Sequence, residues 1–131
     1  MLRLHSLLQK FGQVTMEFGY RAQAEFEYRV AEVAAISWDR WNGTDPEDNL
    51  RGAPELVVEV KSPSNTRAEL RETASLCLAN GCLEFWVVDL DARSITVTRQ
   101  DGSTSMQASG DSLPLAAFGA DTLPVSQVFS D

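Results

Sequence analysis

The 131-residue chain has few of the side chains that hold transition metals or form disulfides. It contains two cysteines, Cys77 and Cys82, and one histidine, His5. The cysteine spacing does not fit a C-x-x-C redox or zinc motif, and a structural zinc site normally needs four cysteine or histidine ligands. We therefore expect two buried thiols in a reducing compartment and no structural zinc.

Long apolar runs and an excess of basic residues are also missing. No segment approaches the ~20 apolar residues of a membrane helix, and the N-terminus does not resemble a signal peptide. We therefore expect a cytoplasmic protein with no membrane contact. Lys and Arg number 11 against 19 Asp and Glu, which gives a net charge of -8. Because proteins that hold nucleic acid by its backbone usually carry a basic face, any nucleic-acid role requires a local basic patch.

What is present is the composition of an ordinary globular protein, 44% hydrophobic and 23% charged. The length matches one domain, so we expect residues 1–131 to form a single domain. A strand, a helix and a strand between residues 55 and 89 fit a crossover unit, and flanking hairpins imply antiparallel neighbours. We therefore predict an α/β fold with a mixed β-sheet, a packed crossover helix and an N-terminal helix. The predicted elements are helices at 2–11 and 66–80, strands at 14–20, 25–37, 55–61, 83–90, 94–99 and 104–108, and a solvated acidic loop at 39–48.

The candidate chemistry lies on the predicted strand 55–61, Glu-Leu-Val-Val-Glu-Val-Lys. Because side chains alternate along a strand, Glu59 and Lys61 point to the same side of the sheet, about 7 Å apart. Glu59 with one carboxylate from a neighbouring strand and a backbone carbonyl would suit Mg²⁺, and a lysine could orient or deprotonate the attacking water. The other interpretation of Glu-x-Lys is a surface ion pair. Glu55, directly after Pro54, is expected to face solvent.

Three segments carry a family resemblance: Arg29-Val-Ala-Glu-Val-Ala34, Ala53-Pro-Glu-Leu-Val-Val-Glu-Val-Lys-Ser-Pro-Ser-Asn-Thr66 and Gly81-Cys-Leu-Glu-Phe-Trp-Val-Val-Asp89. They resemble the successive signature blocks of the Uma family of proposed restriction endonucleases, in the PD-(D/E)XK nuclease superfamily. The similarity covers most of the chain. It implies a restriction-endonuclease-like core and Mg²⁺- or Mn²⁺-dependent hydrolysis of DNA. Family members usually begin with additional strands, so we expect this chain to be N-terminally short relative to the family, a gap that a partner chain could cover.

The resemblance also implies site residues. In the family pattern an Arg-x-Pro-Asp segment supplies the first metal-binding carboxylate, and here Ala31 and Glu32 stand in place of Pro and Asp. The implied metal ligands are Glu32, Glu59 and the Val60 carbonyl, and Lys61 positions or activates the attacking water. Glutamate is one methylene longer than aspartate, so the metal or the backbone must shift by about an ångström for Glu32 to remain a ligand. An ordinary carboxylate in a salt bridge is the other interpretation of Glu32.

The position of the lysine leaves two functions open. Many relatives carry leucine where this chain has Lys61 and place a lysine in the following helix, at a position that here is Thr73. Helical spacing puts position 73 on the inward face, from which a lysine could reach the same pocket. Lys61 restores the plain Glu-x-Lys form, but a degenerate site would look identical. The alternative to a nuclease is therefore a catalytically degenerate nuclease fold that acts as an interaction or homodimerisation module.

Outside these segments the sequence offers basic and aromatic candidates. Arg51, Arg67 and Arg71 flank the Glu59 strand and either meet phosphates or are simply solvated. Trp38 and Trp41 border the acidic loop, where they stack on a base, form a subunit contact or pack against the fold.

Overall fold

A computed structural model of the chain describes residues 2–23, 26–45, 48–63 and 65–128. The helices are α1 (Leu2–Leu7), α2 (Trp38–Gly43), α3 (Arg67–Ala79) and the 3-10 helices η1 (Ala116–Phe118) and η2 (Val125–Gln127). The strands are β1 (Gly12–Gln23), β2 (Phe26–Ser37), β3 (Leu50–Arg51), β4 (Leu56–Val60), β5 (Glu84–Asp89), β6 (Ser94–Arg99), β7 (Thr104–Ala108), β8 (Ser112–Leu113) and β9 (Leu123–Pro124). No helix in these ranges is long and apolar enough to cross a membrane.

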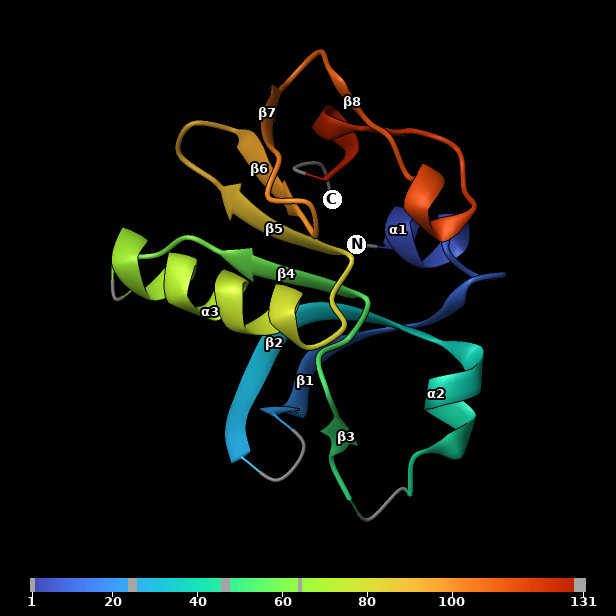
Figure 1. Cartoon of the computed structure of the whole chain (residues 1–131). Coiled ribbons are helices and arrows are strands. Elements are labelled where there is room, and N and C mark those ends of the chain that lie inside the picture. The colour runs from blue at the N-terminus through green and yellow to red at the C-terminus, as the bar shows by residue number, and fades with distance from the viewer. Residues whose placement is uncertain (1, 24–25, 46–47, 64, 129–131) are drawn as a thin grey trace.

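A seven-stranded mixed sheet, in the order β3-β1-β2-β4-β5-β6-β7, forms the frame of the fold. Strands β4 and β5 are parallel and are joined by the crossover helix α3, whereas β2 pairs antiparallel with β4, and β5, β6 and β7 form an antiparallel meander (Figure 1). The predicted mixed sheet with a crossover helix is therefore confirmed. Parallel strands need such a crossover, while antiparallel strands can be joined by tight turns.

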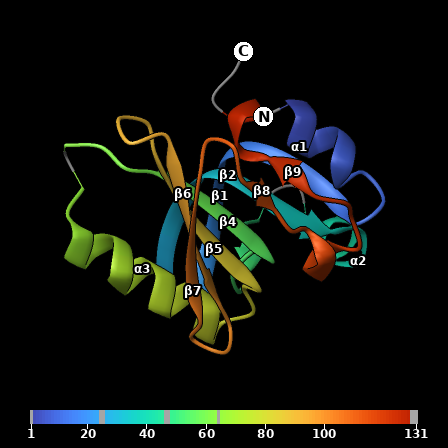
Figure 2. The ribbon, with the colours of Figure 1, turned by 90° about the horizontal axis from the view of Figure 1, so that it is seen from above.

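Each face of the sheet has its own hydrophobic core. One, the α1-side core, includes Leu8, Trp86 and Phe118 and is covered by α1 and the C-terminal segment. The other, the α3-side core, includes Tyr20, Val57, Cys77 and Phe85 and is covered by α3. Figure 2 shows α3 on one side of the sheet and α1 with β8 and β9 on the other. Because both faces are covered near β4 and β5, the middle of the sheet is almost wholly apolar, and a charged group there is conspicuous.

The hairpin of β1 and β2 is bent where β1 changes faces. Val14 belongs to the α1-side core and Tyr20 to the α3-side core, although strict alternation would put both on one face. Between them Glu17 has a φ of 49°, a left-handed conformation that non-glycine residues rarely adopt. Near the start of β1, a Cβ on Gly12 would lie 1.9 Å from the Ile36 carbonyl oxygen. Glycine there allows the close approach of the two strands.

Helix α3 begins with a capping box. The Thr66 side chain accepts from the Glu69 backbone N–H (3.0 Å), and the Glu69 carboxylate accepts from the Thr66 backbone N–H (3.2 Å). Gly81 follows the helix with a φ of +109°, the conformation that glycine favours at a helix end. The predicted helix 66–80 is confirmed within one residue at each end. The helix predicted at 2–11 is shorter, and the acidic segment contains α2 rather than only loop.

Candidate active site

Glu59 and Glu32 lie opposite each other on neighbouring strands. Strands β2 and β4 pair with Val33 against Val58, so one step further the same register sets Glu32 against Glu59. The Glu59 carboxylate accepts a hydrogen bond from the Glu32 backbone N–H. The structure therefore brings together the two carboxylates that the sequence proposes as metal ligands. Glu32 is exposed and Glu59 half-buried, so the pair opens toward solvent from the Glu32 side.

The surroundings of Glu59 disfavour its charge. Burial, and then the negative charge of Glu32, raise the pKa of Glu59 from its usual 4.5 to about 7, against the opposing effect of the Glu32 backbone N–H. Glu59 in turn acts on two groups of the α3-side core. Burial, and to a lesser extent Glu59, raise the pKa of the Cys77 thiol to about 11, and the same two effects contribute to a raised pKa of Tyr20.

Tyr20 and Cys77 form the apolar floor beneath Glu59. The Tyr20 hydroxyl lies 3.1 Å from the Cys77 sulfur, and both side chains are fully buried. Their mutual hydrogen bond satisfies the buried hydroxyl without engaging the carboxylate. Sequence reasoning did not include Tyr20, because the face switch at Glu17 that brings it below Glu59 leaves no periodic signal. With this dry floor on one side, Glu59 has its polar partners on the Glu32 side.

Lys61 is placed beside Asp89 rather than between the carboxylates. Its Nζ lies 3.6 Å from the Asp89 Oδ2, with side chains 50% and 27% exposed. The pKa of Asp89 is lowered first by the backbone N–H of Ala92 and then by Lys61. Parallel pairing of β4 with β5, which continues in the hydrogen bond from the Lys61 N–H to the Val88 carbonyl (2.8 Å), sets the two side chains side by side. No sequence pattern singles out Asp89, although it ends the third signature block.

The Val60 carbonyl, the third predicted ligand, already accepts a hydrogen bond from the Asn65 side chain at 3.3 Å. Asn65 also accepts from the Ser62 N–H at 2.9 Å, so its amide closes the turn after β4. A carbonyl oxygen has two lone pairs, and Asn65 takes one of them. The Asn65 amide therefore links the Val60 carbonyl to the Ser62 backbone N–H.

Glu55, expected to face solvent, is held inside the fold. Its carboxylate accepts from the Arg40 guanidinium at 3.0 Å and from the Ser37 backbone N–H at 3.3 Å, and 13% of its side chain is exposed. Arg40 also donates to the carbonyls of Ala53 and Arg51. These contacts join α2 to the segment before β4. Glu55 thus anchors the start of β4, and Glu59 is the candidate site carboxylate of this strand.

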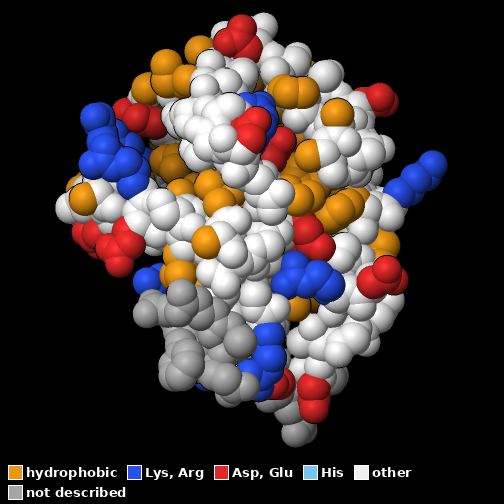
Figure 3. Space-filling view, in the orientation of Figure 1, with side chains coloured by type: hydrophobic (Ala, Val, Ile, Leu, Met, Phe, Trp, Pro, Cys, Tyr) orange, Lys and Arg blue, Asp and Glu red, His pale blue; other side chains and the backbone are white. Residues whose placement is uncertain are grey.

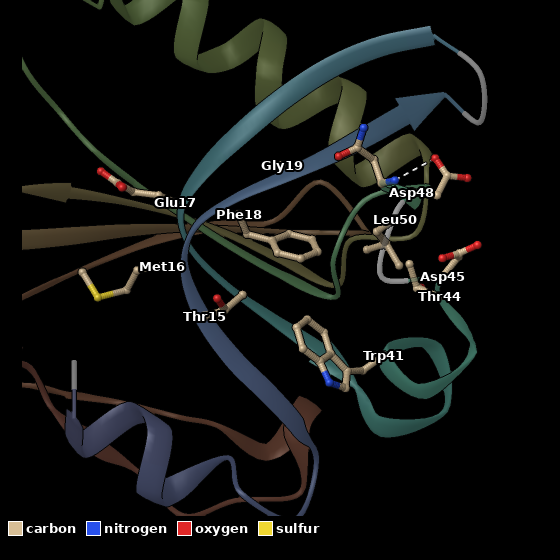
Figure 4. Close-up of a pocket in the computed structure, with 11 residues that line it drawn as sticks. Thr15, Met16, Glu17, Phe18, Gly19, Trp41, Thr44, Asp45, Asp48 and Leu50 are labelled. Atoms are coloured by element: carbon tan, nitrogen blue, oxygen red, sulfur yellow. Dashed lines mark hydrogen bonds between the residues drawn. The ribbon is translucent and has the colours of Figure 1, made fainter.

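Two hollows flank this arrangement. A pocket of about 460 Å³ lies between β1 and the α2–β3 segment, with Phe18 and Trp41 inside it (Figure 4). Their ring centroids are 6.1 Å apart, so Trp41 packs against the fold, which is one of the roles considered for it from the sequence. None of the three predicted site side chains lines this pocket. A second hollow, also about 460 Å³, lies between α3 and the β5–β7 face, and Lys61 lines it.

The donor set suits a hard divalent cation. Two carboxylates and a carbonyl are oxygen ligands, which Mg²⁺ and Mn²⁺ prefer, and Mg²⁺ typically takes one or two protein carboxylates and keeps several waters. Among the described residues, no group of three or more His, Cys, Asp or Glu side chains is arranged to hold a metal. The described residues therefore do not offer a closed cage of side chains.

Comparison with known proteins identifies the family. The model of the Uma2 family, described as "Putative restriction endonuclease", matches residues 2–126. The chain belongs to the Uma2 family. A crystal structure described as a "putative nuclease belonging to DUF820" from Anabaena variabilis has the same fold, with a TM-score of 0.76 at 17% sequence identity, covering 98% of this chain and 76% of that one. No match was found among curated proteins. The Uma2 match supports a nuclease, and the crystal structure shows the shared fold.

Proposed function

We propose that the chain is a divalent-metal-dependent nuclease that hydrolyses phosphodiester bonds in DNA. The observation that carries the proposal is the pairing of Glu32 with Glu59. Burial, and then the negative charge of Glu32, raise the pKa of the half-buried Glu59 to about 7, so ionising both carboxylates costs stability. In a purely structural role this cost remains, because the Glu32 backbone N–H offsets it only in part. The pair becomes favourable when a cation lies between the charges, as in metal-dependent phosphodiester hydrolysis.

Each residue then has a distinct task. Glu32 and Glu59, with the Val60 carbonyl, would hold Mg²⁺ or Mn²⁺, and the bound ion would stabilise the negative charge that develops on the phosphate oxygens. Lys61 presents its ammonium two residues beyond Glu59 on the same face of β4, where it positions the attacking water by hydrogen bonding. Asp89 holds the lysine side chain at 3.6 Å and so limits where the ammonium can move.

The test is cleavage of supercoiled plasmid DNA in Mg²⁺ or Mn²⁺ by purified protein. We expect nicking by the wild type, and we expect Glu59→Gln and Lys61→Met to reduce its rate at least a hundredfold with unchanged circular dichroism. Glu72→Gln is the matched control, because Glu72 is an exposed carboxylate on α3, and it retains the wild-type rate. Equal cleavage by wild type and Glu59→Gln would refute the proposal.

A second candidate is a degenerate nuclease fold that serves as an interaction or homodimerisation module. The observation that favours it is the placement of Lys61, whose ammonium pairs with Asp89 while Glu59 interacts with Glu32. The exposed apolar side chains Met16 and Val30 on β1 and β2, 66% and 50% accessible, would suit a contact surface. Absence of metal binding together with a dimer in sedimentation equilibrium would favour this candidate over the nuclease.

A further inference from the structure

A groove of about 460 Å³ runs between α3 and the part of the sheet that α3 leaves uncovered. The first half of α3 forms its wall. The face of β5, β6 and β7 that lies on the α3 side of the sheet forms its floor. Lys61 stands at one end of it. Because Lys61 and Glu59 share a face of β4, the groove adjoins the Glu32–Glu59 pair and leads away from it along the sheet.

The groove is basic, although the chain is acidic. Its lining includes Lys61, Arg67 and Arg71 and a single carboxylate, Asp89, whereas the chain as a whole carries 19 acidic and 11 basic residues. In Figure 3, Lys and Arg side chains gather at the left edge of the molecule, on the side where α3 begins in Figure 1. The groove therefore supplies the local basic patch that a nucleic-acid partner requires of an acidic protein.

The two arginines are placed for paired contacts. Arg67 and Arg71 are four residues apart on α3, so they lie on one face of the helix, about 6 Å apart along its axis. Both are exposed, and neither has an ion-pair partner among the described residues. A guanidinium that is not tied to a carboxylate is available for the bidentate hydrogen bonds that phosphate accepts.

The floor of the groove adds neutral donors. Thr96 and Thr98 of β6 and Thr104 of β7 line it with their hydroxyl-bearing side chains. Thr98 and Thr104 are cross-strand partners, and the alternation along β6 places Thr96 on the same face. Hydroxyls and arginines are the side chains that contact phosphate and sugar oxygens without reading base sequence.

We propose that the groove binds the sugar-phosphate backbone of one nucleic-acid strand, with Arg67 and Arg71 on successive phosphates and the threonine hydroxyls on the facing oxygens. The inference rests on the proposed function, because the strand is guided toward Lys61 and the carboxylate pair. It goes further in assigning substrate affinity to α3 and β6–β7 rather than to the pocket at Trp41. Contacts to the backbone alone predict binding without base preference.

The experiment measures binding separately from cleavage. Fluorescence anisotropy of a labelled 20-nucleotide single strand is recorded in EDTA between 20 and 150 mM salt for wild type and for Arg67→Gln/Arg71→Gln. We expect the double variant to bind at least tenfold more weakly at 50 mM salt. Loss of two phosphate contacts also lowers the slope of log affinity against log salt by about 1.4. Lys10→Gln removes an exposed charge outside the groove and is expected to change affinity less than threefold.

The outcomes separate the groove from the nuclease chemistry. Three results would overturn the proposal that the groove binds nucleic acid. They are unchanged affinity in Arg67→Gln/Arg71→Gln, an equal loss of affinity in the control, and no binding of the strand by wild type at 20 mM salt. A Glu59→Gln variant that binds the strand like wild type but does not cleave DNA supports the proposed function. This holds whatever the affinity of Arg67→Gln/Arg71→Gln. A single-stranded RNA of the same sequence is expected to bind equally. A strong preference for RNA with the same arginine dependence would keep the groove and contradict DNA as the substrate.

Discussion

Replacing Glu59 by glutamine tests whether this carboxylate is kept at a cost to stability. The pKa of Glu59 rises from 4.5 to about 7 on folding, so the folded state binds its proton more tightly than the unfolded state. The neutral form therefore contributes stability that is fully present below pH 4.5 and is lost as the pH rises through 7. At 1.36 kcal/mol per pKa unit the full effect is about 3 kcal/mol. Because Glu59 is only half-buried, screening reduces it to roughly 1–2 kcal/mol.

Glu59→Gln keeps the oxygen that accepts from the Glu32 N–H and removes the charge. In EDTA, we expect the variant to be more stable than wild type by roughly 1–2 kcal/mol at pH 8 and equal to it at pH 4.5. Urea unfolding across this pH range measures the difference, with Glu72→Gln as the control that leaves the pH profile unchanged. A Glu59→Gln protein that is less stable than wild type at pH 8 would refute the reasoning, because the carboxylate would then be stabilising.

Three further substitutions test the rest of the structure. Asp89→Asn should leave urea unfolding nearly unchanged, because its ion pair with Lys61 is half-exposed, yet lower the DNA cleavage rate severalfold by releasing the lysine. Thr66→Ala should cost about 1 kcal/mol in thermal unfolding, since it breaks the capping box with Glu69, and wild-type thermal stability in Thr66→Ala would argue against that box. Leu56→Ala should cost about 2–5 kcal/mol in urea unfolding, because the side chain is fully buried.

The parts of the fold that follow from local chemistry could be predicted from the sequence. The capping signal Thr66-x-x-Glu69 and the glycine at position 81 bound α3 closely. The apolar run of β5 and the Asp101-Gly102 turn between β6 and β7 are also local signals. Parallel pairing of β4 with β5 followed from the helix between them.

Other features depend on contacts between distant residues. The segment 38–43 contains turn signals but folds as α2, where Trp41 packs against Phe18. Alternation cannot reveal that β1 changes faces at Glu17, and so Tyr20 beneath Glu59 was missed. In each case tertiary packing overrides the local pattern.

The candidate site shows the same division. Strand parity puts Glu59 and Lys61 on one face, but it says nothing about the neighbouring strands. The register of β2 sets Glu32 opposite Glu59, whereas the register of β5 offers Asp89 to Lys61. The Lys61 side chain therefore pairs with Asp89 of β5, and β5 lies on the opposite side of β4 from β2. Predicting this required the strand order, which the sequence of β4 does not contain.

The measurement that tests the central claim most directly is calorimetric titration of metal-free protein with Mn²⁺ at pH 8, where Glu59 is ionised. We predict one site of submillimolar affinity in wild type and in Glu72→Gln. The site should be lost in Glu59→Gln and at least tenfold weaker in Glu32→Gln. Equal Mn²⁺ binding by wild type and Glu59→Gln, or no binding by wild type, would contradict a metal site at this carboxylate pair.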